Sequence, residues 1–106
     1  MDTKARIQVP LDDIKAFAER WGVEEFALFG SVLRDDFSPD SDVDVIVTFK
    51  PGSSVDLFGL VQMEEELKIV FGRSVDLVTA ESVESSRNYI RKREILRSME
   101  KVYDSE

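Results

Sequence analysis

The chain has 106 residues, enough for one hydrophobic core and too few for two, so we expect a single domain over residues 1–106. It has no cysteine and no histidine, which excludes disulfides, thiolate metal sites and histidine ligands, and leaves only hard cations with oxygen ligands as candidate metals. A net charge of −8 argues against direct nucleic-acid binding, and the absence of a membrane-length apolar run or an apolar signal segment predicts a cytoplasmic protein without membrane contact.

The first part of the chain predicts a helix followed by a strand. Apolar residues recur at helical spacing from Leu11 to Trp21, and Gly22 follows as a natural stop. The short apolar run from Phe26 to Phe29 is typical of a buried strand, which Gly30 would end. The residues after Gly30 predict a helical turn or two before a turn rich in Ser, Pro and Asp.

A second strand is predicted from Asp42 to Phe49, and its two faces differ in character. Side chains alternate along a strand, so Val43, Val45 and Val47 would share one face. The other face would carry Asp42, Asp44 and Ile46. Two carboxylates on one face of an otherwise apolar strand require either solvent or a counter-charge, because a buried unpaired carboxylate is costly.

The second half of the chain predicts a helix, a third strand and a helical ending. A loop at Lys50–Ser54 precedes a helix from Leu57 that Gly72 closes, with its glutamates on the more exposed side. Ser74–Thr79 predicts a strand, and the rest has a helical stripe that extends to Val102. We therefore predict an α/β (α+β) domain with a small mixed sheet backed by helices.

Three aspartates and a Gly-Ser pair are the candidate functional residues. Asp76 lies inside the third strand, and if that strand pairs beside the second, Asp42, Asp44 and Asp76 converge on one patch. Mg²⁺ prefers such oxygen ligands, and two ions ~4 Å apart support in-line phosphoryl chemistry. Gly30 and Ser31, where a strand meets a helical turn, offer backbone and hydroxyl donors to a phosphate.

These residues resemble the signature of a known superfamily. Gly30-Ser31, ten intervening residues, Asp42-x-Asp44 and a later strand aspartate resemble the DNA polymerase beta-like nucleotidyltransferases. The segments GSVLRDDFSPDSDVDVIV, LFGLVQMEEELKIVFG and RSVDLVT look most like the minimal nucleotidyltransferases, the MntA-like antitoxins of HEPN toxin–antitoxin pairs. The resemblance implies the nucleotidyltransferase fold and transfer of AMP from ATP, or of a nucleotide from another nucleoside triphosphate, to a hydroxyl. It also implies a partner, a HEPN ribonuclease toxin whose tyrosine accepts AMP in a hetero-oligomer and which is thereby neutralised.

The same resemblance implies a role for each candidate residue. Asp42 and Asp44 would hold two Mg²⁺ ions, with Mn²⁺ as a substitute, and Asp76 would complete the site of one ion and receive the acceptor's proton. Gly30, Ser31 and Arg34 would bind the triphosphate. In this chain Asp35 stands where the family often has glycine, which leaves an exposed ion pair as an equal alternative for Arg34.

Other interpretations remain open for several of these features. A lone Asp-x-Asp is often only a solvated strand end, and Ser31 also suits a helix N-cap. The basic run RNYIRKREILR is either solvated, a partner surface, or a nucleotide-facing segment through Arg87 or Arg91. Two other functions compete with protein adenylylation, namely an antitoxin that acts by binding alone and an enzyme that modifies a small molecule such as an antibiotic. A nucleotide-and-metal site alone lacks an acceptor half, so we expect a protein partner to supply it.

Overall fold

The computed structural model describes residues 9–30, 41–53 and 55–105. In this part of the chain the elements follow the order α1 (Leu11–Trp21), β1 (Val23–Phe29), β2 (Val43–Phe49), α2 (Leu57–Phe71), β3 (Val75–Thr79), α3 (Ala80–Glu84), α4 (Tyr89–Ser98) and β4 (Glu100–Asp104). The helices α1 and α2 end where the sequence predicts, at Gly22 and Gly72. None of the helices in these residues is both long and apolar enough to cross a membrane.

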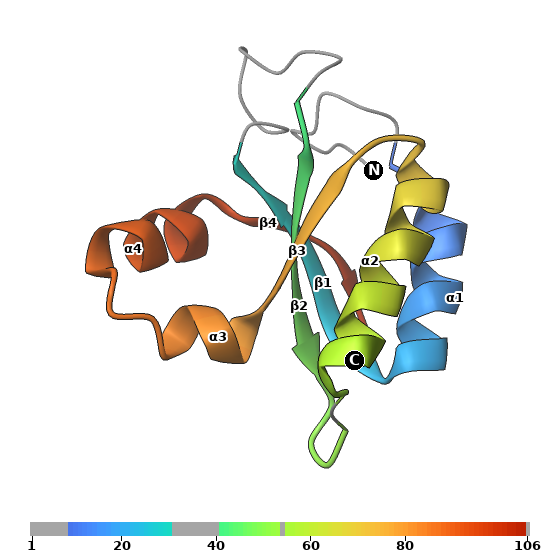
Figure 1. The fold of residues 1–106 in the computed structure, drawn as a ribbon, viewed down its shortest axis with the longest axis horizontal. Helices are drawn as coiled ribbons and strands as arrows, with labels where there is room; N and C mark the ends of the chain where they lie inside the picture. Colours follow the sequence, from blue (N-terminus) through green and yellow to red (C-terminus); the bar gives the residue numbers. More distant parts are fainter. Residues whose placement is uncertain (1–8, 31–40, 54, 106) are drawn as a thin grey trace.

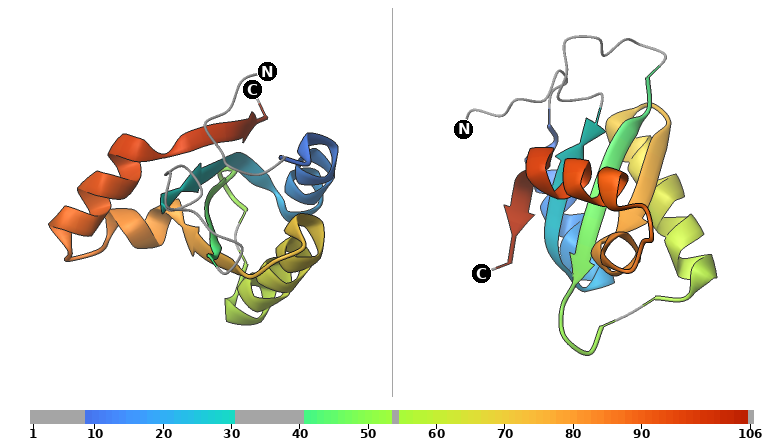
Figure 2. Two further views of the ribbon diagram at one scale, coloured as in Figure 1. Left: turned by 90° about the horizontal axis from the view of Figure 1, so that it is seen from above. Right: turned by 90° about the vertical axis from the view of Figure 1, so that its left-hand side faces the viewer.

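The strands form one mixed sheet in the order β3-β2-β1-β4 (Figure 1). The strand β2 is parallel to β3 and antiparallel to β1, and β4 is antiparallel to β1 on its other side. Figure 2 shows α1 and α2 on one face of the sheet and α3 and α4 on the other. The predicted small mixed sheet backed by helices is confirmed.

The main hydrophobic core lies between the sheet and the pair α1 and α2. Val43, Val45 and Val47 of β2 point into it and are fully buried, as their alternation predicts. Phe17 of α1 and Phe26 of β1 meet there edge to face, with ring centroids 6.0 Å apart. This core holds β1 and β2 rigidly side by side, so it fixes the residues on their opposite face.

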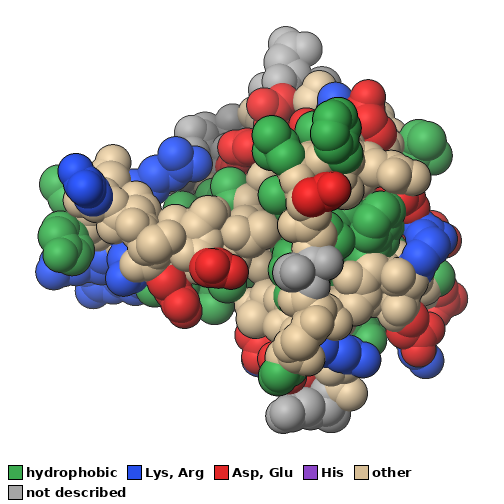
Figure 3. Space-filling model, turned by 60° about the horizontal axis from the view of Figure 1, so that its bottom comes forward, with side chains coloured by type: hydrophobic (Ala, Val, Ile, Leu, Met, Phe, Trp, Pro, Cys, Tyr) green, Lys and Arg blue, Asp and Glu red, His purple; other side chains and the backbone are tan. Residues whose placement is uncertain are grey.

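A smaller apolar cluster lies on the opposite face, under α3 and α4. It contains Ala27, Phe29, Ile46, Val83 and Ile95. Ile95 is the buried residue of α4, and most of this helix projects away from the sheet. We call α4 and the two residues before it, 87–98, the arm. Figure 3 shows Lys and Arg side chains gathered on the arm, at the left of the view, as the basic sequence of this segment leads one to expect.

The end of the chain differs from the sequence prediction. The apolar spacing of Ile95, Met99 and Val102 predicts a continuous helix, but α4 ends at Ser98 and Met99 is extended, with φ −65° and ψ 147°. The following residues form β4, where Val102 is buried against the main core. The prediction of helix is wrong here because β1 offers an open edge, and pairing with it satisfies backbone groups that would otherwise lack partners.

The glutamates of α2 lie on its more exposed side, as predicted, but two of them also contact neighbouring elements. The Trp21 indole N–H donates to Glu66 Oε2 at 3.0 Å, and Arg20 forms an ion pair with the same carboxylate. Glu64 Oε2 accepts a longer bond of 3.4 Å from the backbone N–H of Leu77. Glu66 therefore links α1 to α2, and Glu64 links α2 to β3.

Candidate active site

Three residues of neighbouring strands form a row across the α3 and α4 face of the sheet. Asp44 pairs with Asp76 of β3 on one side and with Phe29 of β1 on the other. Directly opposed residues in a sheet project to the same face, and Phe29 and Ile46 place this face under α3 and α4. The row Asp76–Asp44–Phe29 therefore brings two of the three predicted aspartates together.

Asp42 is the exposed residue just before β2 begins, two residues before Asp44. A hydrogen bond of 2.9 Å from the Val43 N–H to the Ser74 carbonyl joins the starts of β2 and β3 just after it. The negative charge of Asp42 also reaches Lys68 of α2, whose pKa is raised mainly by a hydrogen bond to Glu65 and in smaller part by Asp42. Within the described residues, no three acidic side chains lie close enough together to hold a metal ion.

Gly30 lies directly against the Asp44 carboxylate. Its φ of +74° is in the left-handed region, which side chains other than glycine rarely adopt. A Cβ atom at this position would collide with the Asp44 side chain. The end of β1 and the carboxylate of β2 thus approach each other in a way that only glycine permits. The predicted phosphate ligands Ser31 and Arg34, and Asp35 beside them, lie outside the described residues.

A cavity of about 510 Å³ opens beside Gly30 and Asp44. Its size falls within the range of small-molecule sites. The sheet contributes Phe29, Gly30 and Asp44 to its wall, and the other wall comes from α4 and the residue before it. These residues are Asn88, Ile90, Arg91, Glu94, Ile95 and Ser98.

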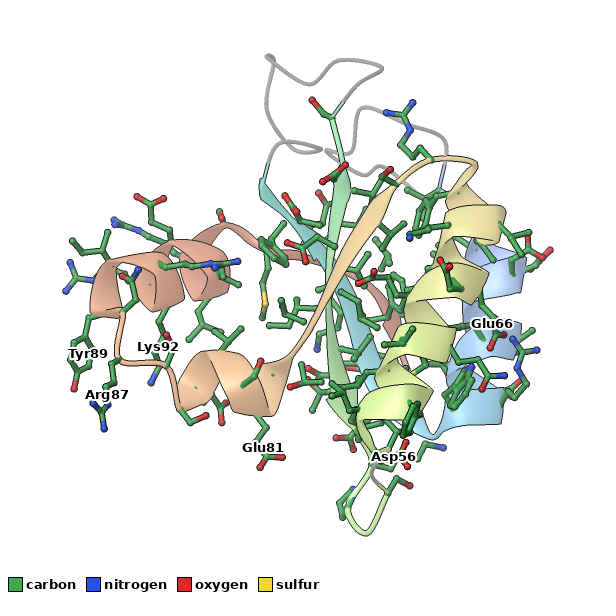
Figure 4. The ribbon with its side chains drawn as sticks, viewed as in Figure 1. Asp56, Glu66, Glu81, Arg87, Tyr89 and Lys92 are labelled. Carbon is green, nitrogen blue, oxygen red and sulfur yellow. The ribbon has the colours of Figure 1, made fainter. Side chains whose placement is uncertain are left out.

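The wall formed by α4 contains functional candidates that sequence analysis did not identify. Arg91 is among the residues named for a nucleotide-facing role, but Asn88, Glu94 and Ser98 are not. Positions 91, 94, 95 and 98 recur at helical spacing, which was the available signal for a shared face. Arg87 does not line this cavity, and Figure 4 places it with Tyr89 at the outer end of the arm.

The donor set of this site suits a hard divalent cation. Mg²⁺ is commonly held by one or two carboxylates together with the phosphates of a substrate. Asp44 and Asp76 supply two neighbouring carboxylates, and the exposed Asp42 lies two residues before Asp44. The Asp44 carboxylate lies against Gly30, so a cation held by Asp44 would lie close to the backbone at the end of β1.

Comparison with known proteins identifies the family of the chain. The model of the nucleotidyltransferase domain family matches residues 14–102. A protein adenylyltransferase, MntA of Thermococcus cleftensis, is 41% identical over 71 residues, which span 67% of this chain and 70% of that protein.

Solved structures share the fold at lower sequence identity. A toxin–antitoxin structure with AMP-PNP has a TM-score of 0.70 and 16% identity, covering 92% of this chain and 76% of its own. A complex of tri-AMPylated HEPN toxin with MNT antitoxin from Shewanella oneidensis has a TM-score of 0.62 and 16% identity, covering 90% of this chain and 70% of its own. With a family model matching most of its length and a relative this similar, the chain belongs to the nucleotidyltransferase domain family.

Proposed function

We propose that this protein is an Mg²⁺-dependent protein adenylyltransferase of the antitoxin type, which transfers AMP from ATP to a tyrosine hydroxyl of a HEPN-type toxin and so neutralises it. The observation that carries the proposal is the position of Asp44, between Asp76 and Gly30 at the edge of a nucleotide-sized cavity. The relatives support the substrate and the partner, since one is a protein adenylyltransferase and a solved structure of the same fold is an antitoxin bound to an AMPylated HEPN toxin.

Different residues of the chain would bind the triphosphate, hold the metal ions and accept the proton. Gly30, Ser31 and Arg34 would hold the triphosphate, and Asp42 and Asp44 would hold two Mg²⁺ ions. When bound, these ions lower the pKa of the acceptor hydroxyl and offset the charge of the polyphosphate. Asp76, which is exposed, would complete one metal site and stand beside the incoming acceptor.

The transfer itself is an in-line displacement at the α-phosphorus of ATP. The acceptor oxygen forms a new bond to this phosphorus while the bond to the oxygen bridging the β-phosphate breaks. Pyrophosphate leaves with the electron pair of that bond. The proton of the acceptor hydroxyl passes to the Asp76 carboxylate, which acts as the general base.

A labelling experiment tests the proposal. The full chain is mixed with Mg²⁺, ATP labelled at the α-phosphate and a purified HEPN-type partner, and label on the partner is measured. We expect the partner to be labelled, and Asp42→Asn combined with Asp44→Asn to reduce labelling by at least about 1000-fold, since it removes the charges that hold the metal ions.

The matched control changes two other neighbouring aspartates, Asp12→Asn with Asp13→Asn. These residues lie exposed in the first turn of α1, on the opposite side of the sheet from the cavity, so labelling should persist. Labelling that survives the change at Asp42 and Asp44 contradicts the site. If the variant with both Asp42→Asn and Asp44→Asn does not label the partner but still rescues cells from the toxin, the protein acts by binding alone.

A further inference from the structure

The row of residues across the sheet divides the site into two sides. Asp44 stands in the middle, with Asp76 on the β3 side and Phe29 followed by Gly30 on the β1 side. The cavity lies on the β1 side, because its wall contains Phe29 and Gly30 but not Asp76. A molecule in this cavity would therefore meet Asp44 from the side opposite Asp76.

The wall formed by α4 is chemically mixed. Ile95 is buried with Phe29 in the smaller apolar cluster, so the two give the cavity an apolar floor. The side chains of Asn88 and Ser98 are engaged in the helix, because Asn88 Oδ1 accepts from the Arg91 N–H at 3.0 Å and Ser98 Oγ donates to the Glu94 carbonyl at 2.6 Å.

Arg91 and Glu94 are the charged residues of this wall. Neither side chain forms a hydrogen bond or an ion pair with any of the residues that the structure describes. The order of the two charges, cation before anion along the helix, is the less favourable one for pairing. A guanidinium and a carboxylate thus remain available one turn apart beside an apolar floor.

From this arrangement we propose that α4 forms the nucleoside-binding wall of the active site. Glu94 accepts hydrogen bonds from the ribose hydroxyls, Arg91 pairs with the phosphates, and the base lies over Phe29 and Ile95. This assignment rests on the proposed function, because it takes a nucleoside triphosphate as the substrate. It also leaves the Asp76 side of the row open for the acceptor.

The chemistry of the cavity favours a nucleotide over the acceptor as its occupant. A vicinal diol can donate two hydrogen bonds to one carboxylate, and hydrogen bonds to charged groups are among the stronger ones. Asp44 and Glu94 alone would repel a polyphosphate, and Arg91 supplies a positive charge on the same wall. A protein tyrosine has neither a diol nor a phosphate, so it would use neither residue.

Equilibrium binding of two nucleotides tests the assignment. The dissociation constants of ATP and 2′-deoxy-ATP are measured by calorimetry in Mg²⁺ for the full chain and its variants. We expect the wild type to prefer ATP by about tenfold, and Glu94→Ala to reduce this preference to nearly none. Arg91→Gln should weaken the binding of both nucleotides by about tenfold and leave the preference unchanged.

Two control variants are matched to these changes. Arg93→Gln removes the same charge from the same helix at an exposed position outside the cavity wall, and Glu81→Ala removes an exposed carboxylate from α3. Both should bind within about twofold of the wild type. If ATP binds but the α4 variants behave like these controls, the assignment of α4 is wrong while the proposed function stands. If ATP does not bind the wild type, both are wrong.

Discussion

At the scale of single residues, the contact between Gly30 and Asp44 decides whether the site can form. The Asp44 carboxylate occupies the space that a side chain at position 30 would need. The sequence indicates this contact only through the family-like spacing of Gly-Ser and Asp-x-Asp. The closeness of the two residues follows from the register of β1 with β2, in which Asp44 lies opposite Phe29.

We predict that Gly30→Ala reduces AMP transfer by about 100-fold or more. The new Cβ displaces the carboxylate, and a shift of about 1 Å in a reacting geometry is enough for such a loss. The left-handed backbone should also cost about 1–2 kcal/mol of unfolding free energy. Transfer rates and urea unfolding measure the two effects separately.

Gly52→Ala is the matched control for this prediction. Gly52 also has a positive φ, +82°, but among the described residues other than its own chain neighbours no atom lies within 4 Å of the place its Cβ would take. It should therefore show a similar loss of stability with unchanged transfer. Equal losses of activity in the two variants would show that Gly30 acts through the backbone alone.

At the scale of elements, sequence patterns predict β1, β2 and β3 but not the edge strand β4. The alternation of Val43, Val45 and Val47 with Asp44 and Ile46 indicates both faces of β2, because a strand buried on one side cannot shift by one residue. The strand β4 is different, since its five residues carry one buried side chain, Val102. Its structure depends on the free edge of β1, which no local pattern reports.

A second feature at this scale is the link between α1 and α2 through Glu66. We predict that Glu66→Ala lowers the free energy of unfolding by about 1–2 kcal/mol, because the partly buried Trp21 indole loses a charged hydrogen-bond acceptor. Chemical denaturation measures this change. Figure 4 shows Glu66 on the side of α2 that faces α1.

The neighbouring glutamate provides the control. Glu65 is exposed and pairs with Lys68 of its own helix, with the two charged atoms 2.9 Å apart. Glu65→Ala should therefore change the free energy of unfolding by less than about 0.5 kcal/mol. A loss at Glu65 equal to that at Glu66 would mean that the ion pairs of α2, and not its contact with α1, stabilise the helix.

At the scale of the whole molecule, charge is divided between a basic arm and an acidic remainder. Five of the basic residues lie from Arg87 to Arg97, in a chain whose net charge is −8. The sequence shows this uneven distribution of charge but not its role. The charge pattern alone does not reveal that α4 folds back beside Asp44. The cavity brings Phe29, Gly30 and Asp44 of the first half of the chain together with α4 near its end, and only the tertiary structure places these two walls opposite each other.

Because the site joins β1, β2 and α4, a ligand that binds it should stabilise the whole fold. We predict that ATP with Mg²⁺, at 100 times its dissociation constant, raises the free energy of unfolding by about 2.7 kcal/mol. For a domain of this size that corresponds to an increase in melting temperature of about 10 °C or more. Differential scanning fluorimetry measures this shift.

ATP with a chelator should give a much smaller shift, because Asp44 and Asp76 would then face the polyphosphate without an intervening cation. Asp44→Asn in the presence of Mg²⁺ should likewise lose most of the stabilisation. Equal shifts with and without Mg²⁺ would contradict the metal site while leaving nucleotide binding intact. Asp44 and Asp76 would then be paired neighbours in the sheet that do not share a cation.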